Sequence, residues 1–206
     1  MIDHPPPTID APLILASASP RRRELLSGMD VPFEVVVSPY REPERKPPIV
    51  PPHQWAAAVA NFKARAVAAA HPLRWVLAAD TLVSCRGEIL NKANGIADAR
   101  RMLELQAGVP SDVFTGVALI RAAEAGDYVD FRTSRTVVWM RDDRALREEY
   151  LASGDWEGKA GAYGIQDVGD RLVERIEGEF SNVVGLPIGL VRSMLLRAGI
   201  RVGDAC

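Results

Sequence analysis

The chain has 206 residues, of which 48% are hydrophobic and 25% are charged, and its 25 Lys and Arg against 27 Asp and Glu give a formal net charge of −2. This composition is typical of a globular domain with one sizeable core, and the length excludes large multidomain architectures. Balanced charge supplies no overall field to attract nucleic acid or an anionic membrane, so we expect neither partner and favour a small-molecule ligand.

The two ends of the chain differ in composition from the rest. Residues 1–11 are polar and rich in proline and residues 203–206 are small and polar, so we expect a disordered N-terminal extension and a C-terminal tail around a single domain over 12–202. Only Cys85 and Cys206 are present, which argues against a disulfide framework or a cysteine metal site. Without a signal-peptide pattern or a run of about 18 apolar residues, the expected location is cytoplasmic.

The first half of the sequence predicts strands, helices and one long loop. The predicted elements are a strand over 13–16, a helix over 21–27 ended by Gly28, a strand over 31–37, a helix over 55–70, a strand over 75–83 and a hairpin return over 88–90. Between them, residues 38–52 carry six prolines and a charged cluster, which suits a loop long enough to be functional.

The second half adds a strand pair and further helices. The predicted elements are a helix over 97–105, strands over 113–121 and 128–140, a helix over 144–152 closed by Gly154, a strand over 172–176, and a helix from Pro187 to about Ala198. The strand aromatics Trp75, Phe131 and Trp139 are expected in the core. Because strands and helices intermix without strict alternation, we predict an α/β fold with a mixed sheet and flanking helices.

Residues 17–22 form the first candidate site. An apolar strand leads into a helix that begins at Pro20 and is capped by Ser19. Such a helix start offers free backbone N–H groups to an anion, while Arg21 and Arg22 add bidentate phosphate donors and Ser17 adds a hydroxyl. The pattern suits a polyphosphate. The alternative is an ordinary capped helix with solvated arginines.

A carboxylate follows the apolar run 75–79. Asp80 is expected at the carboxyl edge of a buried strand, where such groups often hold a metal or act as a base; the alternative is a turn or capping residue. Thr81 and Glu42 supply matching polar types. Lys63 lies in an Ala-rich helix, where a lysine is usually solvated, but its apolar neighbours suggest that it points inward.

The hairpin places another lysine near that carboxylate. A two-residue turn at 86–87 pairs Cys85 with Glu88. Continuing the register sets Lys92 opposite Thr81, so the polar residues cluster at one end of the hairpin.

Residues 158–166 combine closely spaced glycines with Gln166. Small residues let the backbone approach a ligand, and an amide that both donates and accepts is a natural reader of a nucleobase edge. The alternative is a tight loop that only joins two elements.

Taken together, six segments resemble the Maf family of nucleoside triphosphate pyrophosphatases. They are LILASASPRR (13–22), AADT (78–81), LNK (90–92), TGVAL (115–119), AGAYGIQ (160–166) and FSNVVGLP (180–187). The resemblance covers nearly all of the predicted domain. It implies hydrolysis of a nucleoside triphosphate at the α–β anhydride with a divalent cation, Mg²⁺ or Mn²⁺, in a cleft between two lobes. It also implies a homodimer, which is common in the family.

The resemblance also implies roles for individual residues. Asp80 corresponds to the proton acceptor and, with Glu42, to the metal-binding acids. Phosphate-lining positions of the family are matched by Ser17, Arg22, Lys63 and Lys92. Those associated with substrate choice are matched by Arg21, Thr81 and Gln166, and SPRR, ADT and AYGIQ look like the branch that acts on dTTP and UTP rather than the branch that acts on 7-methyl-GTP.

The sequence departs from the family pattern at Arg41, where an acidic residue is usual. This departure bears on the affinity for the metal or on closure of the loop.

Two alternative functions remain open. One is a cell-division regulatory protein that acts through a protein partner with vestigial catalysis, since family members have been linked to division arrest. The other is a purine-directed house-cleaning pyrophosphatase, which the substrate-choice residues disfavour.

Overall fold

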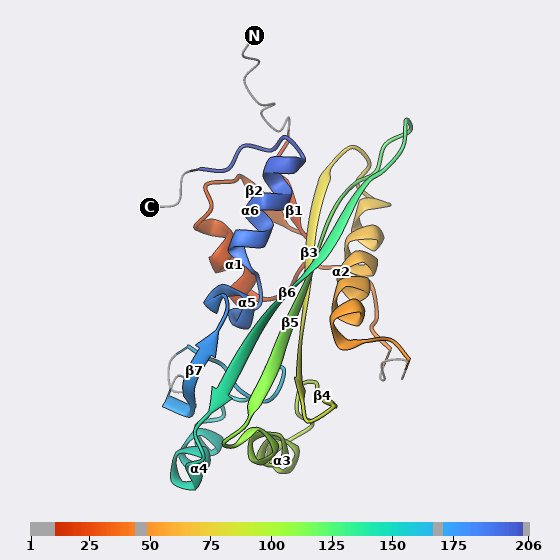
Figure 1. The fold of residues 1–206 in the computed structure, drawn as a ribbon. Coiled ribbons are helices and arrows are strands. Elements are labelled where there is room, and N and C mark those ends of the chain that lie inside the picture. Colours follow the sequence, from red (N-terminus) through yellow and green to blue (C-terminus); the bar gives the residue numbers. More distant parts are fainter. Residues whose placement is uncertain (1–10, 44–48, 167–170, 204–206) are drawn as a thin grey trace.

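The computed structural model describes residues 11–43, 49–166 and 171–203 (Figure 1). The predicted extension over 1–11 and the tail over 203–206 fall outside these ranges except for residues 11 and 203, so both stay predictions. The strands are β1 (Leu13–Leu15), β2 (Phe33–Val35), β3 (Trp75–Cys85), β4 (Glu88–Leu90), β5 (Pro110–Arg121), β6 (Tyr128–Met140) and β7 (Val173–Glu177). The helices are α1 (Pro20–Ser27), α2 (Pro52–Ala68), α3 (Ile96–Gln106), α4 (Arg144–Ser153), α5 (Phe180–Val184) and α6 (Ile188–Arg197).

The strands of the described residues form one mixed sheet in the order β2-β1-β3-β5-β6-β7, with β4 paired to β3. The strand β1 is parallel to both β2 and β3, and all other pairs are antiparallel. This arrangement confirms the predicted α/β fold with a mixed sheet. The two lobes that the family resemblance implies remain a prediction.

Helices cover both faces of the sheet (Figure 1). One face packs against α2 through small side chains, and the other packs against α1 and α6 through larger aliphatic ones. At the far end of the long strands, α3 and α4 close a third apolar cluster that contains Cys85 and Tyr150. Of the helices in the described ranges, none combines the length and apolar composition that crossing a bilayer requires.

The contact between α2 and the sheet depends on Gly116 in β5. A Cβ atom on this glycine would lie 2.1 Å from the carbonyl oxygen of Ala56, which shows that the helix backbone rests directly on the strand. Ala56, Ala60 and Ala64 are fully buried in α2. Close approach of backbone to backbone therefore sets how near the side chains of α2 come to β3.

The predicted register of the hairpin is confirmed only for the residues that pair between β3 and β4. Cys85 pairs with Glu88 as predicted, and the last pair is Val83 with Leu90. Lys92 does not continue the ladder to Thr81; it forms an isolated antiparallel bridge with Ala160. The segment after β4 therefore turns away from β3 to pair with the glycine-punctuated loop.

Three other differences concern elements and burial. The short helix α5 is not predicted, because five residues are too few to show a period. The helix α2 begins at Pro52, before the predicted start at residue 55. Phe131, expected in the core, is 49% exposed on β6, so that prediction is wrong.

Candidate active site

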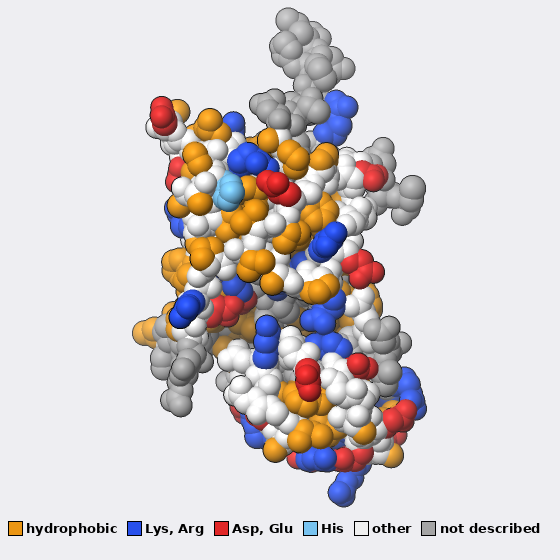
Figure 2. All heavy atoms as spheres, turned by 180° about the vertical axis from the view of Figure 1, so that it is seen from behind, with side chains coloured by type: hydrophobic (Ala, Val, Ile, Leu, Met, Phe, Trp, Pro, Cys, Tyr) orange, Lys and Arg blue, Asp and Glu red, His pale blue; other side chains and the backbone are white. Residues whose placement is uncertain are grey.

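Residues distant in sequence line a cavity of about 1140 Å³. It is bordered by all but one of the predicted site residues, namely Arg21, Arg22, Glu42, Lys63, Asp80, Thr81, Lys92 and Gln166. The exception, Ser17, lies behind Arg22 and contacts its guanidinium. In the space-filling view the middle of the molecule is hollowed, with Lys and Arg side chains at its rim (Figure 2).

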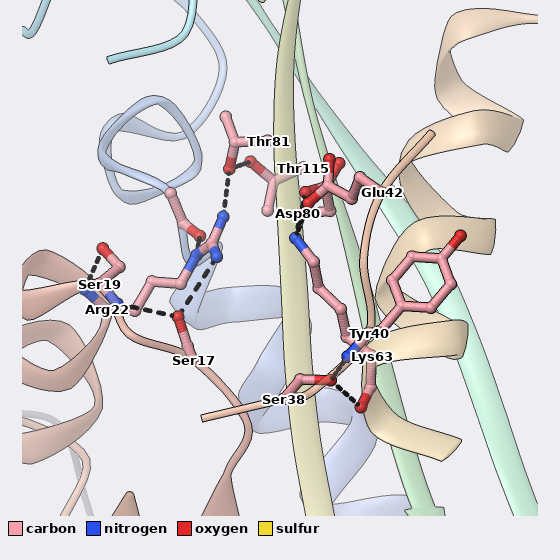
Figure 3. A network of polar contacts seen from close by, with 11 residues as sticks. Ser17, Ser19, Arg22, Ser38, Tyr40, Glu42, Lys63, Asp80, Thr81 and Thr115 are labelled. Atoms are coloured by element: carbon pink, nitrogen blue, oxygen red, sulfur yellow. Dashed lines mark hydrogen bonds and ion pairs between the residues drawn. The ribbon is translucent and has the colours of Figure 1, made fainter. Parts of the chain in front are cut away.

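Two carboxylates converge on one ammonium group (Figure 3). Lys63 Nζ of α2 donates to Asp80 Oδ1 of β3 at 2.7 Å and forms a second ion pair with Glu42 from the loop after β2. The side chains of Lys63 and Asp80 are only 17% and 12% exposed. The inward orientation predicted for Lys63 is thus confirmed, and the solvated alternative is wrong.

Asp80 does not end its strand, in contrast to the prediction. It lies inside β3, paired with Gly116 of β5. The parallel neighbour β1, however, ends at Leu15, which is paired with Leu77. Asp80 therefore lies just beyond the carboxyl end of β1, where the chain turns toward α1, and this explains why it meets the residues at the start of that helix.

Burial is the main influence on the charge of Asp80. Desolvation raises the pKa of Asp80 above its ordinary value of 3.8, the charges of Lys63 and Arg22 oppose the rise, and the charge of Glu42 adds to it. Tyr40, which sequence analysis does not single out, packs against Phe62 with ring centroids 5.4 Å apart. Burial, followed by the charge of Glu42, raises the pKa of Tyr40.

The start of α1 orients Arg22 into the site. Ser19 caps the helix as predicted, and Pro20 occupies its first turn. The Arg22 guanidinium donates from Nε to the Gly185 carbonyl at 2.7 Å, from Nη2 to Thr81 Oγ1 at 3.0 Å and from Nη1 to Ser17 Oγ at 3.4 Å (Figure 3). The solvated alternative is therefore wrong for Arg22, whose side chain is fixed from three directions.

Lys92 and Gln166 reach the cavity from the segments after β4 and α4. Lys159, which the sequence patterns do not indicate, also lines the cavity. Its side chain packs against Gly164, where an added Cβ atom would lie 3.1 Å from Lys159 Nζ. The glycine spacing of this loop is the only sequence signal that could have indicated the close approach.

The donor set fits a divalent cation that shares its coordination with a ligand. Within the described ranges, no group of three or more His, Cys, Asp or Glu side chains is arranged to hold a metal ion. Asp80 and Glu42 do converge, and Mg²⁺ at nucleotide sites is typically held by one or two carboxylates together with substrate phosphates.

The fold is α/β, and its cavity gathers the buried carboxylate of Asp80, the exposed carboxylate of Glu42 and several cationic side chains, a combination that can bind an anionic, phosphate-bearing ligand. Residues 12–198 match the family model described as "Maf-like protein", and the chain belongs to this family.

The similarity to known proteins covers almost the whole chain. A protein of Deinococcus radiodurans is 45% identical over 192 residues, which cover 91% of this chain and 93% of that protein. A protein of Salinibacter ruber is 46% identical over 181 residues, 87% of each chain, and one of Moorella thermoacetica is 44% identical over 191 residues, 92% of this chain and 96% of that protein. All three are named dTTP/UTP pyrophosphatase.

Proposed function

We propose that this protein is a nucleoside triphosphate pyrophosphatase that hydrolyses dTTP and UTP to the monophosphate and pyrophosphate. The observation that carries the proposal is the buried Asp80, paired with Lys63 and facing Arg22 in a cavity of about 1140 Å³. The names of the similar proteins support the same reaction and the same substrates.

In this reaction Asp80 accepts the proton of the attacking water. In the protein without a cation, burial raises the pKa of the Asp80 carboxylate, and the pairing with Lys63 fixes the direction in which the carboxylate points. Arg22 and Lys92 offset the charge of the phosphates and stabilise the pyrophosphate that leaves. The protein contributes positioning and electrostatics, with no covalent intermediate.

The divalent cation, Mg²⁺ or Mn²⁺, would be held by Asp80 and Glu42 together with the substrate phosphates. When bound, it neutralises phosphate charge and polarises the reacting phosphoryl group. Lys63 pairs with both of these carboxylates and would place its positive charge beside the phosphates.

Substrate choice is assigned to residues around the cavity. Arg21, Thr81 and Gln166 border it, and the Gln166 amide can both donate to and accept from a pyrimidine edge. The proposal further holds that the protein is cytoplasmic, forms a homodimer, and has no nucleic acid or membrane partner.

Pyrophosphate release from dTTP, UTP, CTP, 7-methyl-GTP and ITP with Mg²⁺ or Mn²⁺ tests the proposal, with Asp80→Asn beside the wild type. We expect dTTP and UTP to be preferred and the variant to lose about 10²- to 10⁴-fold in rate, the range of general base catalysis. Preference for ITP would favour the purine-directed alternative. Absence of turnover with either metal would contradict the proposal and favour the regulatory alternative.

A further inference from the structure

Two threonine hydroxyl groups, a half-buried one at Thr81 and a fully buried one at Thr115, continue a chain of hydrogen bonds from Arg22. Arg22 Nη2 donates to Thr81 Oγ1 at 3.0 Å, and Thr81 Oγ1 is 2.9 Å from Thr115 Oγ1 (Figure 3). Thr115 Oγ1 in turn donates to the backbone carbonyl of Asn182 at 2.9 Å. Thr115 and Asn182 have no exposed surface. The chain joins α1, β3, β5 and α5, elements far apart in sequence.

The direction of each hydrogen bond in this chain is fixed. A carbonyl oxygen only accepts, so the single hydroxyl proton of Thr115 points to Asn182. Thr115 Oγ1 must then accept from Thr81, which uses the one proton that Thr81 has. Thr81 consequently accepts from Arg22 and has no proton left to donate to a ligand in the cavity.

At the end of this hydrogen-bond chain that is remote from Arg22, the side chain of Asn182 is held by two further hydrogen bonds. Its amide nitrogen donates to the Val113 carbonyl and to Thr136 Oγ1, both at 3.1 Å. These contacts tie α5 to β5 and β6, and the helix ends at Gly185, whose carbonyl accepts from Arg22 Nε at 2.7 Å. Asn182 and Thr115 therefore fix two of the three acceptors that hold the Arg22 guanidinium.

We propose that Thr81, Thr115 and Asn182 are positioning residues that orient Arg22 toward the phosphates, and that Thr81 influences the substrate through Arg22 rather than by donating a hydrogen bond to the nucleobase. This inference rests on the proposed function. A guanidinium has five N–H donors, and the three protein contacts leave two for phosphate oxygens. Arg22 thus meets the ligand already oriented, which lowers the entropic cost of binding.

The test uses Thr115→Val, which keeps the shape of the side chain and removes its hydroxyl, beside Thr115→Ser, which restores it. For Thr115→Val we expect the KM for dTTP and the Kd for inorganic pyrophosphate with Mg²⁺, measured by calorimetry, to rise about tenfold, the effect of one hydrogen bond. Thr115→Ser should stay within about twofold of the wild type. The matched control is Thr133→Val, which loses a hydrogen bond from β6 to the His53 carbonyl and leaves Arg22 untouched.

Two further readouts separate positioning from a loss of fold or from base recognition. The ratio of kcat/KM for dTTP to that for CTP should not change in Thr115→Val, because Thr81 has no proton to donate to the base. In an Arg22→Lys background, which lacks the guanidinium, the effect of Thr115→Val on pyrophosphate binding should shrink to less than about twofold. Thermal unfolding of each variant confirms that it is folded, and Thr81→Ala replaces Thr115→Val if the latter does not fold.

Wild-type pyrophosphate affinity in Thr115→Val, a changed ratio of dTTP to CTP, or an undiminished effect in the Arg22→Lys background would overturn the inference. A wild-type protein that binds pyrophosphate but turns over no nucleotide would contradict the proposed function instead. The calorimetric comparison still decides on the positioning of Arg22 in that case, because it does not depend on turnover.

Discussion

Asp80 is a charged residue in a place where burial opposes its charge. Because folding raises its pKa, the folded protein binds this proton more tightly than the unfolded chain does. The stability that Asp80 contributes is therefore fully present below its ordinary pKa and is lost as the pH rises through its folded pKa.

The upward shift in the pKa of Asp80 leads to a prediction for the metal-free protein. With EDTA present, the free energy of unfolding of the wild type should fall relative to that of Asp80→Asn as the pH rises from the ordinary aspartate range toward neutrality. Urea unfolding of both proteins at several pH values measures the difference. A difference that grows in the opposite direction would mean that Lys63 and Arg22 outweigh burial.

Lys63 provides a second test at the residue scale. Lys63→Met removes the ammonium that lies 2.7 Å from Asp80 Oδ1, and we expect kcat/KM for dTTP to fall about 10²-fold or more, as for other preorganised charges in active sites. Arg65→Met on the same helix is the control, because Arg65 is half exposed and pairs with Asp127 at 3.9 Å, away from Asp80 and Glu42. Equal losses in the two variants would contradict a specific role for Lys63.

Sequence patterns predict the types of residue that the cavity gathers, but not all of their contacts. The pair between Lys63 and Asp80 joins positions 17 apart, and that between Arg22 and Gly185 joins positions 163 apart. Local periodicity carries no information on such distances. Asn182 lies in one of the segments that resemble the Maf family, but its role in holding α5 depends on contacts that exist only in the folded protein.

At the scale of elements, the position of α2 depends on a glycine in the opposing strand. Gly116→Ala would place a Cβ atom 2.1 Å from the Ala56 carbonyl oxygen and 2.4 Å from the Ala57 nitrogen. Backbone cannot give way as a flexible side chain can, so the helix must move from the sheet and Lys63 must move with it.

We therefore expect Gly116→Ala to lower the free energy of unfolding by about 3 kcal/mol or more and to reduce activity in the fraction that folds. Gly28→Ala is the control, because Gly28 has an ordinary φ of −76° and its added Cβ would lie 3.6 Å from the Leu25 carbonyl. Denaturant unfolding of both variants measures the effect. Equal stability of the two would contradict the close packing of α2 on β5.

Most elements could be predicted because their signals are local. Alternating and continuous apolar runs predict the strands, and Gly154 ends α4 in a left-handed conformation, as a glycine at a helix end commonly does. Local signals could not predict three features: the short helix α5, the exposure of Phe131 and the pairing of Lys92 with Ala160. Each of them depends on which other segment of the chain lies beside it.

At the scale of the whole molecule, the sheet brings predicted site residues that are spread from Arg21 to Gln166 in the sequence to one cavity. Arg22 arrives with α1, Lys63 with α2, Asp80 with β3, and Gln166 with the loop that follows α4. The net charge of −2 hides this local concentration of cations, which is why overall charge could favour a small-molecule ligand but not identify it.

The identity of the products tests the central claim most directly. Incubation of the wild type with dTTP and Mg²⁺, followed by chromatography and a phosphate assay without added pyrophosphatase, should give dTMP and pyrophosphate in equal amounts. Release of dTDP and inorganic phosphate would show cleavage at the β–γ anhydride and would contradict the assigned reaction.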